Sequence, residues 1–335
     1  MPIWLRTVLS VTLLLGSAYL LGPCPPRPQY SLVLPSVPQN ARSLMAYIQS
    51  KESQHCLKPD NQARIVWCHG DDQHKTEYSI VYLHGFSASQ EEGDPVHRRL
   101  AARYGCNLFL TRLDGHGLDT AAPLLTMTAT GLWEDAKEAL QIGKALGHKV
   151  ILVGTSTGGT LALLLAAKFP ADVYAVINMS PNIEINQPLA FLANNHWGLA
   201  MSRMIKQSDY NIAPAKNEMQ ARYWYTKYRL EAVSELEELL ESSMTPGTFQ
   251  AVHQPVLNLY YYKNQQEQDP TVRVSAILNM QQALGTPDSL KLAVAIPNAG
   301  THVLGCALTS KDIPAVETAI YHFMENTLHL RPLED

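Results

Sequence analysis

The chain has 335 residues, of which 46% are hydrophobic, a proportion typical of a globular protein with a buried core. Its formal net charge is −4, so it has no basic excess that would attract a nucleic acid backbone. These properties exclude a largely disordered chain and a nucleic-acid-binding protein, and they predict one large α/β domain with an insertion.

The first 22 residues differ from the rest of the chain. After one basic residue, Arg6, an uncharged apolar stretch leads into the proline-rich sequence PCPPRPQYSLVLPSVP. This pattern predicts a signal peptide or signal anchor over residues 1–22 and a Pro-rich linker over residues 23–40. We therefore expect an exported or membrane-anchored protein, which in a bacterium would lie on the periplasmic or another extracytoplasmic side.

Three fates of this segment stay open. A small-x-small cleavage site at Gly16 and Ala18 favours removal, whereas inclusion of residues 3–5 makes the apolar stretch long enough for a retained anchor. The sequence LLGPC also resembles a lipoprotein acylation box ending at Cys24, although Pro23 fits such a box poorly.

Four cysteines follow Cys24. In an exported chain they permit two disulfides, and Cys56 and Cys68 flank a segment that could close as a loop. Free buried thiols are an equal alternative for Cys106 and Cys306, whose neighbours are apolar. The cysteines show neither a CxxC motif nor Cys/His metal spacing, so no metal site is predicted.

Beyond the linker, strand-like and helix-like segments alternate. Strands are predicted at RIVWC (64–68), YSIVYLHGF (78–86), CNLFLTRL (106–113), KVILVG (149–154), VYAVINM (173–179), PVLNLYYY (255–262) and LKLAVAI (290–296). Helices are predicted at residues 94–105, 130–147, 157–170, 274–285 and 313–328. Such alternation is typical of a mostly parallel sheet covered on both faces, here expected within residues 41–335.

One stretch breaks this alternation. From about residue 182 to about residue 250 the sequence has no convincing central strand, but it has helical segments rich in aromatic residues and Met. Because this stretch is too long for a loop, it predicts a helical insertion, or cap, over about residues 182–250. Its glutamates are interpreted as a solvated helix face. Its aromatic residues either form the core of the cap or line an apolar substrate pocket: Trp197, Tyr223, Trp224, Tyr225 and Tyr228.

Ser156 is the candidate nucleophile. It lies in GTSTGG (154–159), between the apolar segment KVILVG and the helical segment TGGTLALLLAAK. A Gly-x-Ser-x-Gly motif alone arises by chance, but a strand before it and a helix after it predict a sharp elbow that exposes the serine. The helix would also direct its first N–H groups toward an oxyanion.

A serine hydroxyl needs a base, and the base needs an orienting carboxylate. His302 follows the last predicted strand in PNAGTHVLG and is the expected base. Asp269 follows the strand before it and is the expected acid, with Glu267 as the competitor. The alternative role of Asp269 is that of an N-cap for the helix that follows. The expected oxyanion donors are the backbone N–H groups of Thr157 and of Phe86, in a loop that His84 shapes.

These segments resemble the α/β-hydrolase family, and within it the monoglyceride-lipase-like and esterase branch, which is similar to S33 serine peptidases. The resemblance is carried by HGF (84–86), LDGHG (113–117), LWEDAKEAL (132–140), GTSTGG (154–159) and THV (301–303). It implies a triad of Ser156, Asp269 and His302, an oxyanion hole at Phe86 and Thr157, and a helical cap between two strands. The acid loop KNQQEQDPTV departs from the compact Gly-x-x-Asp turn usual in the family.

The resemblance implies hydrolysis of a lipid-like or small apolar carboxylic ester through an acyl-enzyme, without a metal or organic cofactor. The same triad would serve a thioesterase, an amidase or peptidase, or an acyltransferase. A non-catalytic binding module on the same fold is the remaining alternative. The sequence leaves the natural substrate and the oligomeric state open.

Overall fold

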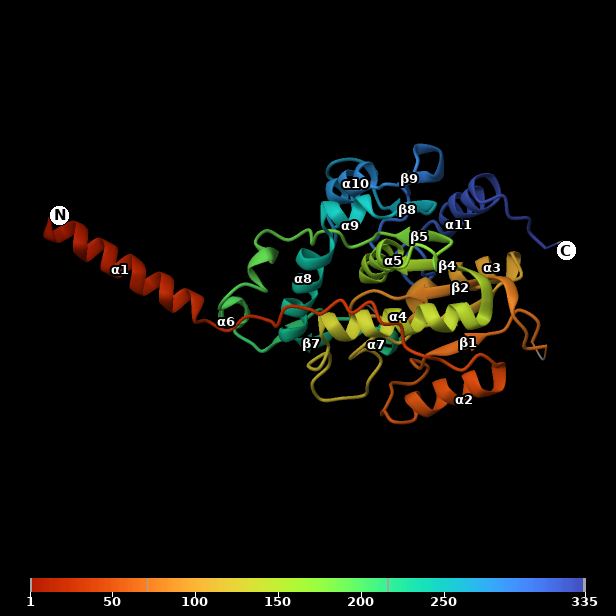
Figure 1. Cartoon of the computed structure of the whole chain (residues 1–335), viewed down its shortest axis with the longest axis horizontal. Helices are drawn as coiled ribbons and strands as arrows, with labels where there is room; N and C mark the ends of the chain where they lie inside the picture. Colours follow the sequence, from red (N-terminus) through yellow and green to blue (C-terminus); the bar gives the residue numbers. More distant parts are fainter. Residues whose placement is uncertain (1, 71, 216, 334–335) are drawn as a thin grey trace.

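The computed structural model describes residues 2–70, 72–215 and 217–333. Positions 1, 71, 216, 334 and 335, which fall within the segments predicted from the sequence, lie outside the described residues. Within these residues, a seven-stranded sheet forms the centre of the molecule (Figure 1). β1 pairs antiparallel with β3, and the other neighbouring strands pair in parallel. The spatial order is β1 (Arg64–Val66), β3 (Asn107–Leu110), β2 (Thr76–Leu83), β4 (Gly147–Thr155), β5 (Ala175–Met179), β8 (Val256–Tyr260) and β9 (Lys291–Ala295).

Each segment predicted as a strand supplies one strand of this sheet, so the expected α/β class and mostly parallel sheet are confirmed. Alternate residues of β2 face opposite hydrophobic clusters: Val81 lies in one cluster, and Ile80 and Tyr82 lie in the other. A central parallel strand has no solvent-facing side, which explains why its sequence is continuously apolar.

Helices cover both faces of the sheet. One cluster joins the sheet to α2 (Ala41–Glu52), α4 (Ala129–Leu146), α5 (Thr157–Lys168), α9 (Pro246–Gln250) and α10 (Val274–Ala283). The other joins it to α3 (Val96–Arg103), α11 (Ile313–His322) and the π-helical turn η4 (Phe323–Thr327). Short 3-10 turns are η1 (Gln90–Gly93), η2 (Ala190–Leu192) and η3 (Asp288–Leu290). Helix α2 was not predicted from the sequence; its first turn is capped by the Asn40 side chain.

Between β5 and β8 the chain forms η2, α6 (Gly198–Lys206), α7 (Glu218–Tyr223), α8 (Glu231–Ser243) and α9. A small antiparallel hairpin, β6 (Tyr210–Ile212) with β7 (Lys227–Arg229), was not expected. The interpretation of the glutamates of α8 as a solvated face is wrong for Glu237, which is buried, because α8 packs between α4, α5 and the rest of the cap.

Helix α1 (Ile3–Leu20) projects away from the body beside α6 (Figure 1). It has no buried residue and is long and apolar enough to cross a membrane. The end of this segment contacts the cap, because the Trp197 indole donates a hydrogen bond to the Ala18 carbonyl at 3.1 Å. Farther along, Trp133 binds the Ser31 carbonyl at 3.0 Å, which ties the Pro-rich segment to α4.

The disulfide that the sequence permits between Cys56 and Cys68 is not formed, and each cysteine in the described part of the chain is free. The Cys56 carbonyl accepts a hydrogen bond from Asp119, beyond the carboxyl end of β3, whereas the Cys68 amide binds Asn107 at the start of β3. The two cysteines therefore lie toward opposite ends of the same strand. Cys106 and Cys306 are free and buried, as their apolar neighbours suggested.

Candidate active site

Ser156 lies at the turn between β4 and α5. Its φ of 53° and ψ of −118° form a strained conformation that a residue with a Cβ rarely adopts. Its N–H donates to the Met179 carbonyl of β5 at 3.0 Å, and its own carbonyl accepts from the Asn182 N–H at 3.0 Å. These bonds to the neighbouring strand and its loop hold the elbow in place.

The glycines around Ser156 allow the backbone to turn this sharply. A Cβ at Gly158 would lie 1.9 Å from the Leu83 carbonyl oxygen, and a Cβ at Gly154 would lie 2.5 Å from the backbone of Gly158. No side chain fits at such distances, so close packing of α5 against β2 and β4 requires glycine at both positions.

Asp269 and His302 form a hydrogen-bonded pair. His302 Nδ1 lies 2.7 Å from Asp269 Oδ2, which directs the other ring nitrogen, Nε2, away from the acid. Asp269 Oδ1 accepts hydrogen bonds from the N–H groups of Thr271 at 2.8 Å and Val272 at 3.0 Å. Asp269 therefore orders its own loop and binds the histidine. Its competitor Glu267 is exposed and pairs with Lys263 at 3.0 Å.

The charges of this pair are set by opposing effects. Burial alone would raise the pKa of Asp269, but the His302 ring and two backbone N–H groups lower it below its ordinary value. Burial alone would lower the pKa of His302, but the Asp269 carboxylate raises it above 6.5. Asp269 is therefore a carboxylate at neutral pH, and His302 is a base that titrates above the usual range.

The three residues follow strands of one sheet region. Ser156 follows β4, Asp269 follows β8 and His302 follows β9, so all lie at the carboxyl edge of parallel strands. Among the described residues, the Ser156 hydroxyl has no hydrogen-bond partner, whereas the pair of Asp269 and His302 is already in contact. Catalytic hydrogen bonds are often completed only when substrate binds.

The loop after β2 packs against Ser156. A Cβ at Gly85 would lie 3.0 Å from the Cβ of Ser156, so a larger residue there would press on Ser156. The N–H groups of Phe86 and Thr157, the expected oxyanion donors, make no hydrogen bond within the described residues. Thr157 is the first residue of α5, where an N–H has no partner inside the helix.

Two buried histidines support this loop. His84 Nε2 accepts the Leu113 N–H at 3.1 Å, and His116 Nε2 accepts the Ser87 N–H at 3.0 Å. Burial lowers the pKa of His116 to about 4 and that of His84 well below 6.5, so both rings are neutral acceptors. The shaping role expected of His84 fits these contacts. The sequence analysis gave no role to His116, although it lies in the LDGHG motif.

Sequence reasoning also missed Glu92. This residue is 2% exposed, and its carboxyl accepts the Gly85 N–H in the loop that packs against Ser156. Burial raises its pKa to about 7. The sequence QEEG gave no signal of this role, because adjacent acidic residues beside a glycine are typical of a surface turn.

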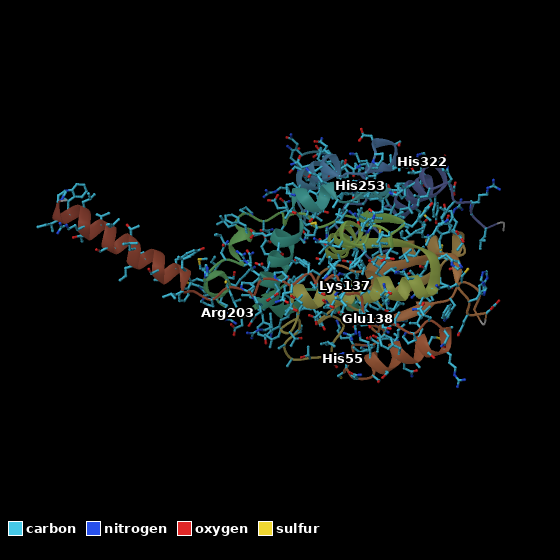
Figure 2. The ribbon with its side chains drawn as sticks, in the orientation of Figure 1. His55, Lys137, Glu138, Arg203, His253 and His322 are labelled. Atoms are coloured by element: carbon cyan, nitrogen blue, oxygen red, sulfur yellow. The ribbon has the colours of Figure 1, made fainter. Side chains whose placement is uncertain are left out.

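Within the described residues, no group of three His, Cys, Asp or Glu side chains is placed to hold a metal ion. Figure 2 shows three other histidines, His55, His253 and His322, far apart on the body of the molecule. They follow α2, follow α9 and end α11, respectively.

Comparisons with known proteins agree with this architecture. Residues 80–310 match the model of a family described as the alpha/beta hydrolase family. No curated protein matches the chain in sequence.

Several solved structures share the fold. A structure reported with LipS and LipT, two metagenome-derived lipolytic enzymes, has a TM-score of 0.64 and 18% identity, covering 81% of this chain and 99% of its own. The monoacylglycerol lipase of Paleococcus ferrophilus has a TM-score of 0.58 and 13% identity, covering 79% and 98%. A soluble variant of the Saccharomyces cerevisiae monoglyceride lipase, in complex with a substrate analogue, has a TM-score of 0.60 and 12% identity, covering 79% and 91%. Because the family model spans most of the chain and the fold agrees, the chain belongs to the alpha/beta hydrolase family.

Proposed function

We propose that the protein is a serine hydrolase that cleaves carboxylic esters through an acyl-enzyme. The observation that carries this proposal is the strained elbow at Ser156, at the same sheet edge as the hydrogen-bonded pair of His302 and Asp269. A strained, glycine-packed serine beside an oriented histidine is an arrangement that activates a hydroxyl.

In the proposed reaction, His302 Nε2 takes the proton of Ser156 Oγ as that oxygen attacks the ester carbonyl. The N–H groups of Phe86 and Thr157 stabilise the oxyanion, and Asp269 stabilises the protonated imidazole. His302 then gives its proton to the leaving alcohol. Water, deprotonated by His302, then attacks the acyl-enzyme. His302 returns that proton to Ser156 Oγ as the acid is released, which restores the neutral ring and the serine hydroxyl.

The state of His302 sets the pH dependence. Only the neutral ring accepts the proton of Ser156, and its pKa is raised above 6.5. We therefore expect kcat/KM to increase with pH through a pKa above 6.5 and to fall as His302 becomes protonated.

We propose that α1 anchors the protein to a membrane and that the cap faces the lipid. Trp197, Met204 and Ile205 are 43%, 72% and 79% exposed and lie in or beside α6, next to the end of α1. Figure 2 shows Arg203 in the same part of the cap. An apolar surface of this kind beside an apolar helix fits a bilayer interface, and a lipid-like ester is the substrate class that this location supplies.

The same groups would also cleave a thioester or an amide, since the nucleophile does not choose the leaving group. The first test is labelling of the full chain in detergent with a fluorophosphonate probe, with hydrolysis measured on p-nitrophenyl esters, a thioester and a peptide amide. We expect labelling and ester turnover, and loss of both by about 10⁴-fold or more in Ser156→Ala. Equal labelling of Ser156→Ala and the parent would contradict the nucleophile, and amide cleavage without ester turnover would contradict the ester.

A further inference from the structure

A buried carboxyl group lies behind the oxyanion loop. Glu92, on η1, is 2% exposed, and one of its carboxyl oxygens accepts the Gly85 N–H. A carboxyl group removed from water is costly unless its surroundings compensate it, so such a group requires an explanation.

Gly85 lies between Glu92 and the nucleophile. A Cβ at Gly85 would lie 2.8 Å and 2.9 Å from the two carboxyl oxygens of Glu92 and 3.0 Å from the Cβ of Ser156. The carboxyl group and Ser156 thus approach the same side of one glycine. Only the two backbone dihedrals of Gly85 separate its N–H from the N–H of Phe86, and glycine restricts those dihedrals least. Because glycine itself restricts these dihedrals so little, the direction of the Phe86 N–H depends on contacts that hold the loop, and the bond from the Gly85 N–H to Glu92 is such a contact.

The surroundings of Glu92 come from three parts of the chain: the cap, β2 and the loop after β9. Trp224, in the cap, is a further hydrogen-bond donor to its carboxyl, and the positive charge of His302 favours its ionised form. In return, the Glu92 charge helps to raise the pKa of His302. Tyr82 on β2 and the buried thiol of Cys306 also interact electrostatically with the Glu92 carboxyl, and both keep their protons at neutral pH because their pKa values are raised.

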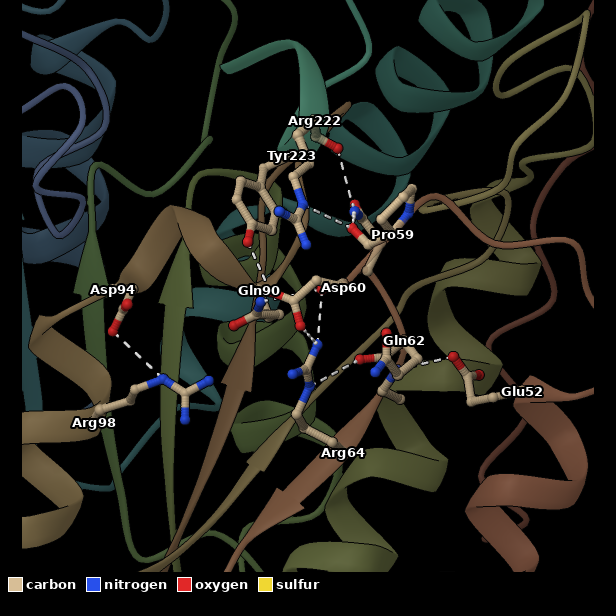
Figure 3. Close-up of polar contacts among 12 residues, drawn as sticks. Glu52, Pro59, Asp60, Gln62, Arg64, Gln90, Asp94, Arg98, Arg222 and Tyr223 are labelled. Carbon is tan, nitrogen blue, oxygen red and sulfur yellow. Dashed lines mark hydrogen bonds and ion pairs between the residues drawn. The ribbon is translucent and has the colours of Figure 1, made fainter. Parts of the chain in front are cut away.

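The turn that carries Glu92 is also connected to the cap. The Asp60 carboxyl accepts the Tyr223 hydroxyl at 2.7 Å and pairs with Arg64 at 2.6 Å, while the Asp60 carbonyl accepts Gln90 Nε2 at 3.4 Å (Figure 3). Gln90 begins η1, so Asp60 links the cap to this turn. These contacts connect the turn that carries Glu92 to the cap through Asp60.

We propose that Glu92 is a positioning residue: its carboxyl group aims the Phe86 N–H at the oxyanion, and its negative charge stabilises protonated His302. The inference rests on the proposed hydrolase function, because it acts on the Ser156 reaction. A neutral acceptor would fill the first role alone, whereas the second role needs the charge.

The test compares two neighbouring carboxyl groups. Glu91 is half-buried, and burial together with Asp94 and Asp60 raises its pKa to about 7 as well, but it is not among the groups that act on His302. Full-length Glu92→Gln, Glu91→Gln and Glu92→Ala are labelled with a fluorophosphonate between pH 5 and 9, and the rate constant is measured at each pH. The labelling rate depends on Ser156 and His302 but requires no ester turnover.

Glu92→Gln keeps an acceptor oxygen and loses the charge. We expect its maximal labelling rate to stay within about threefold of the parent. We also expect the acidic limb of its pH profile, where the labelling rate falls as His302 becomes protonated, to move about 0.5 unit to lower pH, since His302 loses a favourable charge. Glu92→Ala also loses the acceptor, and we expect its maximal rate to fall about tenfold or more because one oxyanion donor is no longer aimed. Glu91→Gln should match the parent in both respects.

A purely structural role would lower the melting temperature without moving the acidic limb. The inference is wrong if Glu92→Gln and Glu91→Gln have the same limb, or if Glu92→Ala folds and labels at the parent's maximal rate. If Glu92→Ala does not fold, the position of the acidic limb in the pH profile of Glu92→Gln decides whether the inference is correct. Labelling without ester turnover in the parent would contradict the proposed function and leave the assignment of Glu92 to be decided by the same pH profiles.

Discussion

The carboxyl edge of the sheet and the cap are organised in different ways. At the edge, Ser156 and Asp269 are 5% and 0% exposed, and backbone hydrogen bonds hold them. In the cap, Met204 and Ile205 are 72% and 79% exposed. The comparison teaches that the geometry of the proposed chemistry is set by backbone contacts within the sheet, while the cap presents a surface that the rest of the chain leaves uncovered.

The sharpest test of the edge concerns the acid. Asp269→Asn keeps the shape of the side chain but no longer stabilises the protonated ring of His302, so we expect kcat on a p-nitrophenyl ester to fall about 10³- to 10⁴-fold. Glu267→Gln, in the same loop, should stay within about twofold, because Glu267 is exposed and pairs with Lys263. A large loss of kcat in Glu267→Gln together with a small loss of kcat in Asp269→Asn would assign the acid to Glu267 in place of Asp269.

A second test measures how rigid the elbow is. Gly158→Ala places a Cβ 1.9 Å from the Leu83 carbonyl oxygen, so we expect the free energy of unfolding to fall by about 3 kcal/mol or more. Gly247→Ala is the matched control, because the nearest atom to its added Cβ lies 3.9 Å away. Chemical denaturation of both variants gives the values. If the two variants had the same free energy of unfolding, the backbone around Ser156 would be able to move to accommodate the added Cβ.

The smallest effect is expected in the cap. Ile205→Glu adds a charge to the exposed surface beside α1, so we expect turnover of a vesicle-bound ester to fall about threefold, with a soluble short-chain ester almost unchanged. Leu278→Glu on α10 also alters an exposed leucine, which is 37% exposed, and should affect neither substrate. The measurement uses the full chain reconstituted in vesicles. If both variants lose activity equally on vesicles, the cap is not the surface that faces lipid.

The sequence predicted the central sheet well because buried parallel strands leave continuous apolar runs such as residues 149–154. It also predicted the strand–turn–helix geometry at Ser156, since glycine spacing and the two flanking patterns are local. It did not predict α2, and it did not predict β6 and β7. These two strands have three residues each, and their pairing depends on contacts distant in sequence.

The errors in the sequence analysis have a common cause. A disulfide between Cys56 and Cys68 was suggested by a short separation along the chain, but β1 places the two residues toward opposite ends of one strand. Glu237 and Glu92 were not distinguished from surface glutamates, because burial of a carboxyl depends on which element packs over it. A linear pattern carries no information about that partner.

The packing of Gly158 against Leu83 separates two kinds of constraint on this motif. Replacement of Ser156 removes a hydroxyl from a site where the backbone already adopts its turn, so the fold tolerates the loss. Replacement of Gly158 forces α5 and the end of β2 to move apart. A descendant of this protein that had lost catalysis would therefore still keep Gly154 and Gly158. The presence of these glycines in a relative would indicate the same backbone turn, and it would not indicate activity.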